Sequence, residues 1–130
     1  MRLKILLILS LLLTQNTIAD VYYCADIDSN GFYFQDGKYQ RSGFKTDKFK
    51  INFNASNNSI VLKTSEETKN YICEKPPQGV MPELLICNSL WDGFNFNIKT
   101  GRYVESTAFG FVSGDGDSID VSYGQCDKFD

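Results

Sequence analysis

Short stretches in which hydrophobic and polar residues alternate recur along this chain from residue 21 onward. Hydrophobic side chains occupy every second position in residues 48–54, and the same period of two returns in residues 94–98 and 119–123. A period of two is typical of a β-strand that buries one face and exposes the other. The pattern therefore predicts half-buried strands that share one core.

Turn-forming residues separate these stretches. Asp36 and Gly37 form the pair that a two-residue hairpin turn favours, because both positions need a positive φ. With turns about every ten residues, the chain is expected to be all-β, a small antiparallel barrel or sandwich of roughly eight to ten short strands. A single helical turn is expected at residues 65–69. The expected strands are residues 21–24, 32–34, 38–40, 48–54, 59–64, 71–73, 84–87, 94–98, 102–105, 108–112 and 119–123.

The first 19 residues are typical of a cleavable signal peptide. Arg2 and Lys4 precede the apolar run of residues 5–13, and small residues at Thr17 and Ala19 predict cleavage after Ala19. The apolar run is less than half of the roughly 20 residues that a membrane-spanning helix needs. We therefore expect a secreted or periplasmic protein without membrane insertion, in which residues 20–130 form one domain.

The four cysteines all lie after the leader, and their even number predicts two disulfides in an oxidising compartment. A four-thiolate zinc site is not favoured, because no two cysteines have the close spacing of a zinc knuckle. We expect Cys24–Cys126 to join the first strand to the last and Cys73–Cys87 to close a proline-containing loop. The pairing Cys24–Cys73 with Cys87–Cys126 remains an alternative.

Charge and composition narrow the function. Loss of Arg2 and Lys4 with the leader changes the net charge from −3 to −5, which disfavours nucleic acid and anionic membranes as partners. The chain contains no histidine, so His-dependent catalytic triads, Cys–His dyads and His-ligated zinc are excluded. We expect a binding domain for a protein or glycan ligand, without cofactor or enzymatic activity.

Acidic residues leave two further hypotheses open. A carboxylate-dependent hydrolase would need two acidic side chains at a defined separation in one cleft. Residues 26–31 match the start of a calcium loop, but the twelfth position is Gly37 instead of the chelating glutamate, so we predict an Asx-rich turn and no metal site. The acidic side chains considered for these roles are Asp26, Asp28, Glu74, Glu83, Asp92, Glu105, Asp115, Asp117 and Asp120.

Aromatic side chains suggest a contact surface. Residues 22–23 and 32–34 are runs of adjacent aromatics, whose members point to opposite faces of a strand, so some must face outward unless both faces are covered. Trp91 lies at a predicted loop edge. A binding domain is therefore expected to present an exposed aromatic patch or a groove.

The chain resembles two families of exported proteins. Residues 22–24, 94–103, 109–112 and 124–129 resemble a family of short exported proteins from marine phages and bacteria, which implies export but no activity. The chain also resembles, more loosely, periplasmic inhibitors of C-type lysozyme in its Tyr-x-Cys start, residues 101–103, Phe109 and residues 114–115. This likeness implies an inhibitor of a cell-wall hydrolase with a protruding loop that enters the enzyme's cleft.

Overall fold

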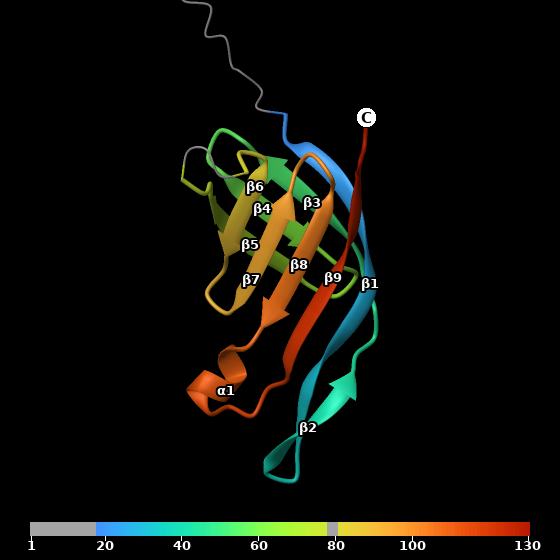
Figure 1. The fold of residues 1–130 in the computed structure, drawn as a ribbon, viewed down its shortest axis with the longest axis vertical. Helices are drawn as coiled ribbons and strands as arrows, with labels where there is room; N and C mark the ends of the chain where they lie inside the picture. Colours follow the sequence, from blue (N-terminus) through green and yellow to red (C-terminus); the bar gives the residue numbers. More distant parts are fainter. Residues whose placement is uncertain (1–17, 78–80) are drawn as a thin grey trace, which may run out of the picture.

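Antiparallel strands form most of the described part of the protein, residues 18–77 and 81–130, in a computed structural model (Figure 1). Eight strands close into a barrel in the order β1-β3-β4-β5-β6-β7-β8-β9, and β9 pairs back with β1. The predicted all-β class is thus confirmed, and the architecture is a barrel. The strands are β1 (Asp20–Gln35), β2 (Lys38–Gly43), β3 (Lys48–Asn54), β4 (Ser59–Lys63), β5 (Thr68–Glu74), β6 (Leu84–Asn88), β7 (Asp92–Asn97), β8 (Arg102–Thr107) and β9 (Ile119–Lys128).

The long strand β1 serves two parts of the molecule. Its first residues pair with β3 inside the barrel, and its last residues pair with β2 in a hairpin that extends beyond the barrel (Figure 1). The hairpin turn is the predicted one, with φ of 51° at Asp36 and 77° at Gly37. The loop that returns from β2 to β3 runs along the right side of the barrel in this view, and its residues help to form the site described below.

The disulfides have the favoured predicted pairing. Cys24 and Cys126 are direct partners on β1 and β9, so this bond links the first and last strands where the barrel closes. Cys73 and Cys87 are direct partners on β5 and β6 and close a loop with a sequence separation of 14. The two bonds are compatible with an extracellular or periplasmic protein, because such bonds persist in oxidising compartments.

The alternating apolar positions of residues 48–54 and 94–98 contribute to the barrel core, as predicted. In residues 119–123 the prediction is wrong, because Val121 and Tyr123 face outward and Ser122 faces inward. Phe49, Ile51 and Phe53 of β3 are buried, as are Phe94 and Phe96 of β7. Aromatic rings dominate the middle of the core, where the ring centroids of Phe94 and Tyr103 lie 5.4 Å apart. Below this layer the inward positions become polar, so the interior divides into an apolar half and a polar half.

Two local predictions are wrong. Residues 65–69 form no helical turn, since Thr64 binds the backbone of Glu66 and Glu67 and turns the chain directly into β5. The strand expected at residues 108–112 is instead the short helix α1 (Phe109–Ser113), which ends at Gly114 with a left-handed φ of 81°. Helix α1 lies beyond the edge of the barrel, where no neighbouring strand is available for pairing (Figure 1).

The acidic run at residues 26–31 is also not the predicted turn. It lies within β1, which stays paired with β9 on both sides of a bulge between Asp26 and Asp28. A bulge adds one residue to one strand and changes which side chains point inward. Asp26 and Ser29 therefore both line the barrel interior, although they are three positions apart and regular alternation would place them on opposite faces.

Candidate functional site

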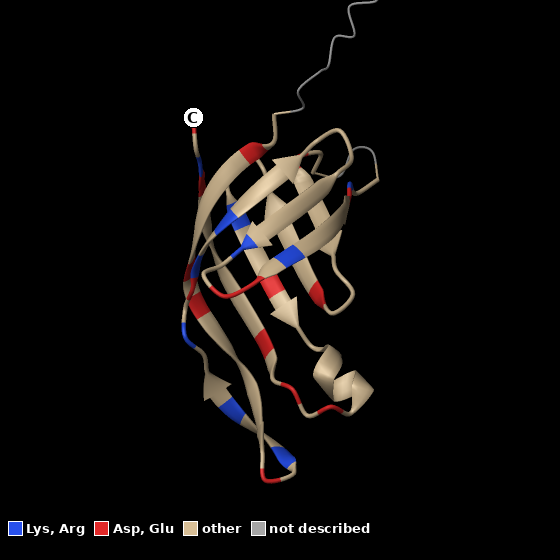
Figure 2. Ribbon diagram, turned by 180° about the vertical axis from the view of Figure 1, so that it is seen from behind, with Lys and Arg blue, Asp and Glu red and all other residues tan. Residues whose placement is uncertain are grey.

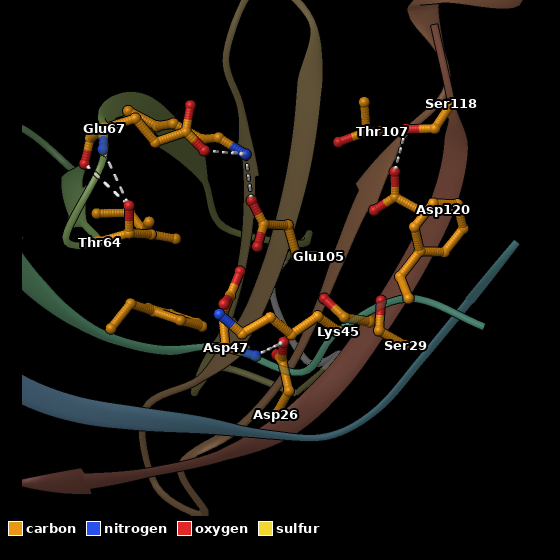
Figure 3. A pocket seen from close by; sticks show the side chains of 15 residues that line it. Asp26, Ser29, Lys45, Asp47, Thr64, Glu67, Glu105, Thr107, Ser118 and Asp120 are labelled. Carbon is orange, nitrogen blue, oxygen red and sulfur yellow. Dashed lines mark hydrogen bonds and ion pairs between the residues drawn. The ribbon is translucent and has the colours of Figure 1, made fainter. Parts of the chain in front are cut away.

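The lower end of the barrel contains a polar pocket of about 390 Å³, which we call the mouth pocket (Figure 3). Its lining comes from β1, the β2–β3 loop, β5, β8 and the chain around β9, so residues distant in sequence share one space. The lining side chains include five carboxylates and two ammonium groups, an excess of three negative charges when all are ionised. The charged members are Asp26, Lys45, Asp47, Glu67, Lys69, Glu105 and Asp120.

The floor of the mouth pocket is the aromatic layer of the core. The rings of Phe49 and Tyr103 lie 5.2 Å apart, and those of Tyr71 and Phe94 lie 5.6 Å apart. Each tyrosine directs its hydroxyl toward an acidic group of the pocket. The Tyr71 hydroxyl donates to Glu105 Oε1 at 3.0 Å, and the Tyr103 hydroxyl donates to Asp26 Oδ1 at 2.6 Å.

Both phenols stay protonated, and this follows from their surroundings. Burial, followed by the charge of Glu105, raises the pKa of Tyr71 above its ordinary value. Burial, followed by the hydrogen bond to Asp26, does the same to the pKa of Tyr103. Gly124 makes room for the Tyr103 hydroxyl, because a Cβ at this position would overlap that hydroxyl and the Ala25 carbonyl oxygen. The two tyrosines are therefore fixed donors that hold carboxylates at the pocket floor.

Lys69 organises the carboxylates on one side of the pocket. Its ammonium lies 2.8 Å from Glu105 Oε1, 3.1 Å from Asp92 Oδ2 and 3.4 Å from Glu67 Oε1. Burial alone would lower the pKa of Lys69, but hydrogen bonds and charges from Glu105 and Asp92 outweigh it and raise that pKa. Lys69 thus remains a cation, and these four residues form what we call the Lys69 network.

Glu105 and Asp120 are the two carboxyl groups of the pocket whose ionised form is clearly disfavoured by burial. Burial raises the pKa of Glu105, although Lys69 and the Tyr71 hydroxyl counteract part of the effect. Burial also raises the pKa of Asp120, which accepts a hydrogen bond from the Ser118 hydroxyl at 3.2 Å on Oδ1. No ammonium lies within ion-pair distance of Asp120 among the described residues. Asp120 is therefore a desolvated acid without its own counter-charge.

Two serine hydroxyls complete the pocket wall. Ser29 and Ser122 are only 5% and 6% exposed, and both line the mouth pocket. They are direct partners across β1 and β9, and Ser122 is also the partner of Glu105 across β9 and β8. Within residues 18–77 and 81–130, neither hydroxyl takes part in a hydrogen bond. Among the described residues, the Tyr39 hydroxyl is the one completely buried side-chain polar atom without a hydrogen-bond partner, so the Ser29 and Ser122 hydroxyls are not sealed off. They open onto the mouth pocket, where a partner from outside the protein could bind.

The acidic residues singled out from the sequence separate into two groups. Asp26, Glu105 and Asp120 line the mouth pocket, and Asp92 reaches it through the Lys69 network. The others do not join them: Glu74 and Glu83 border the loop at the opposite end of the barrel, Asp115 and Asp117 are exposed after α1, and Asp28 accepts a bond from the Ser29 backbone (Figures 1 and 2). Among the described residues, no group of potential ligands has the arrangement of a metal site.

The sequence did not point to three residues that make the pocket polar and charged. Lys69 lies in a polar segment that resembles any solvent-exposed stretch, and Ser29 and Ser122 are small residues in strands. The alternation around Ser122 pointed the wrong way, because the apolar residues Val121 and Tyr123 were expected to face the core. They are 49% and 48% exposed, and Ser122 between them is the buried residue. The inward face of β9 is polar here because it lines the mouth pocket and not the apolar core.

A second candidate surface lies on the outside of the barrel. Outward side chains of β1, β8 and β9 form an exposed apolar strip, which we call the outer strip: Ile27, Phe32, Val104, Val121 and Tyr123. Trp91 is also exposed, as predicted, and packs on Phe109 of α1 with ring centroids 4.0 Å apart. The sequence led us to expect an exposed aromatic patch or a groove, and the described residues include exposed aromatic side chains on the outside of the barrel and the mouth pocket at its end.

Comparison of this chain with protein-family models, with curated proteins and with solved structures found no match. No helix in the described part of the chain has both the length and the apolar character that crossing a membrane requires. The predicted leader falls mostly on residues 1–17, which lie outside the described residues. The mouth pocket and the outer strip are therefore the two features of the described residues that bear on function.

Proposed function

We propose that this protein is an exported binding domain whose mouth pocket receives a small polar ligand. The observation that carries the proposal is the convergence of polar atoms without protein partners at one end of the barrel. Ser29, Ser122 and Asp120 contribute them from β1 and β9, above an aromatic floor. The pocket volume of about 390 Å³ lies within the range of roughly 300–1,000 Å³ that is usual for small-molecule sites.

The energetics of the Lys69 network support a role in binding. Replacing a buried ion pair by well-packed apolar side chains often leaves stability unchanged or raises it by about 1–4 kcal/mol. An apolar mouth would therefore serve stability at least as well as Glu105, Asp92 and Lys69 do. Charged residues that keep this end of the barrel open and polar are better explained by a ligand than by stability.

Binding accounts for the pocket better than hydrolysis does. A carboxylate-dependent hydrolase needs one protonated acid and a second carboxylate free to act as base or nucleophile. Asp92 and Glu105 are brought together at the site, but both bind the same ammonium of Lys69. Asp92 also accepts a hydrogen bond from Thr107 at 2.7 Å, which further limits its freedom to react.

Nuclear magnetic resonance titration of the oxidised protein with small amines, alcohols, carboxylic acids and monosaccharides tests the pocket. We expect amide shifts to concentrate at Ser29, Glu105, Asp120 and Ser122. The variant Ser122→Leu should abolish them because it fills the pocket from within. The matched control Tyr123→Leu changes the next residue, which points to the outer strip, and should retain them. Shifts that remain in Ser122→Leu and disappear in Tyr123→Leu would assign binding to the outer strip instead.

A second candidate, inhibition of a cell-wall hydrolase, is favoured by the hairpin of β1 and β2. This hairpin extends beyond the barrel and presents Phe32, Tyr33 and Phe34, which are all exposed by more than a third (Figure 1). Exposed aromatics on a projecting element are typical anchors of protein interfaces. If this candidate is right, an equimolar amount of the protein should suppress lysis of bacterial cell walls by a C-type lysozyme, and Tyr33→Ala should weaken the inhibition at least tenfold. Full lysozyme activity at a large excess of the protein excludes this candidate.

A further inference from the structure

The charge distribution of the mouth pocket indicates which chemical class of ligand it receives, an inference that rests on the proposed function. Five carboxylates face two ammonium groups, and the Lys69 ammonium is already shared among Glu67, Asp92 and Glu105. Asp120 has no ion-pair partner within the described part of the chain. The pocket therefore has an excess of negative charge, and the carboxylate without a counter-charge is on β9.

The free acceptor atoms lie close enough together to surround one cationic group. Ser122 is the direct strand partner of Glu105, and Asp120 precedes Ser122 by two residues on the same inward face of β9. Adjacent strands lie about 4.8 Å apart and inward residues along one strand about 7 Å apart. Among the described residues, Glu105 Oε2 and Asp120 Oδ2 have no hydrogen-bond donor, and the Ser122 hydroxyl has no partner either. An ammonium group carries three donors, which these three acceptors can satisfy.

Other ligand classes fit the pocket less well. An anion would meet an excess of negative charge, and a neutral ligand would exclude water from Asp120 and Glu105 without replacing the lost hydration, which is costly for buried charges. A bare metal ion is disfavoured because the described residues include no set of converging metal ligands. Phe44 and Phe49 line the same pocket and provide an apolar wall for the carbon part of a ligand.

We propose that the mouth pocket binds an organic cation, a primary amine with an apolar body. Its ammonium group lies between Glu105, Asp120 and the Ser122 hydroxyl, and its carbon skeleton lies against Phe44 and Phe49. The Ser29 hydroxyl, beside Ser122 on β1, is available to a second polar group of the ligand. Charge-assisted hydrogen bonds of this kind are about twice as strong as neutral ones, so the charge of the ligand decides its affinity.

Three probes of similar shape test the charge requirement: 2-phenylethylamine, 2-phenylethanol and 3-phenylpropanoate. Dissociation constants measured by titration of the oxidised protein should show the amine binding at least tenfold more tightly than the alcohol, with the carboxylate weakest. Asp120→Asn should weaken amine binding at least tenfold and leave the alcohol nearly unchanged. Asp127→Asn, which removes an exposed acid from the same strand outside the pocket, is the matched control and should change neither.

The possible failures of this experiment are distinguishable. If the alcohol or the carboxylate binds as tightly as the amine, with shifts at Ser122 and Asp120, the organic cation is wrong while the pocket remains a binding site. The same conclusion holds if Asp120→Asn leaves amine affinity unchanged. If none of the probes shifts the pocket residues of the folded protein, both this inference and the proposed function are overturned.

Discussion

Replacing Cys24 and Cys126 together by alanine should lower the free energy of unfolding by about 4–5 kcal/mol, the largest effect that we expect from any double substitution. The reason is the length of the loop that the bond closes, since the two cysteines are separated by 102 positions. In the chain-entropy model, a longer loop leaves the unfolded chain more freedom once the bond is removed. Urea denaturation of the variant and of the parent protein measures the difference.

The second disulfide provides the matched control for this prediction. Cys73 and Cys87 also join neighbouring strands and are also buried, but their separation is only 14. Their replacement by alanine should cost about 3 kcal/mol, because the shorter loop constrains the unfolded chain less. An equal or larger loss for Cys73 and Cys87 would contradict loop length as the cause. Local packing of the four buried sulfur atoms would then be the dominant contribution.

Lys69→Met should lower the free energy of unfolding by about 3 kcal/mol at neutral pH. Removal of one partner from a buried ion pair typically costs about 3–5 kcal/mol, because the other charge remains without compensation. The side chains of Lys69, Asp92 and Glu105 are 21%, 11% and 16% exposed to solvent. Water therefore compensates part of the lost interaction, and we expect a loss at the lower end of that range. Methionine preserves most of the volume of lysine, so the change tests the charge.

The dependence of this loss on pH separates charge from packing. Burial already raises the pKa of Glu105 above its ordinary value of 4.5, and removal of Lys69 should raise that pKa further. A carboxyl group whose pKa is raised by folding stabilises the protein below its unfolded pKa, and this contribution is lost as pH rises through the folded pKa. The deficit of Lys69→Met should therefore shrink as pH falls from neutral through the raised pKa of Glu105 in the variant, and it should be smallest below 4.5, where Glu105 binds a proton in both proteins.

Lys128→Met is the matched control for Lys69→Met. Lys128 pairs with Asp20 at 3.2 Å, but both side chains are more than two-fifths exposed, so solvent already screens the pair. Its replacement should leave the urea midpoint nearly unchanged at neutral pH, as is usual for surface ion pairs. Equal losses in the two variants, or a Lys69→Met deficit that does not vary with pH, would show that the Lys69 network does not hold uncompensated charge.

Strand positions in this protein were largely predictable because a period of two is a local property. Residues 48–54 alternate between apolar and polar side chains, and β3 has the matching alternation of buried and more exposed residues. The turn at Asp36 and Gly37 was predictable for the same reason, since the conformational preferences of these residues act without distant partners. The disulfide pairing followed from the expectation that the first and last strands of a small closed sheet meet.

Local patterns failed where the surroundings decided the conformation. Residues 109–113 alternate as a strand would, but no strand edge is available beside them, and they form α1. Residues 26–31 have the composition of a turn, yet pairing with β9 keeps them extended. In both places, the hydrogen-bond partners supplied by the rest of the chain outweighed the preference of the segment, as often happens with marginal propensities.

The sequence was sufficient for the all-β class, for most strand positions and for the presence of two disulfides, because alternation, turn chemistry and the number of cysteines can be read without knowing distant contacts. The mouth pocket was not accessible in this way. Lys69 meets Glu105 across 36 positions, and Asp26 meets Tyr103 across 77, so their proximity depends on the register of paired strands around a closed barrel. Register and closure are collective properties of all eight strands, and they alone turn scattered acids and serines into one site.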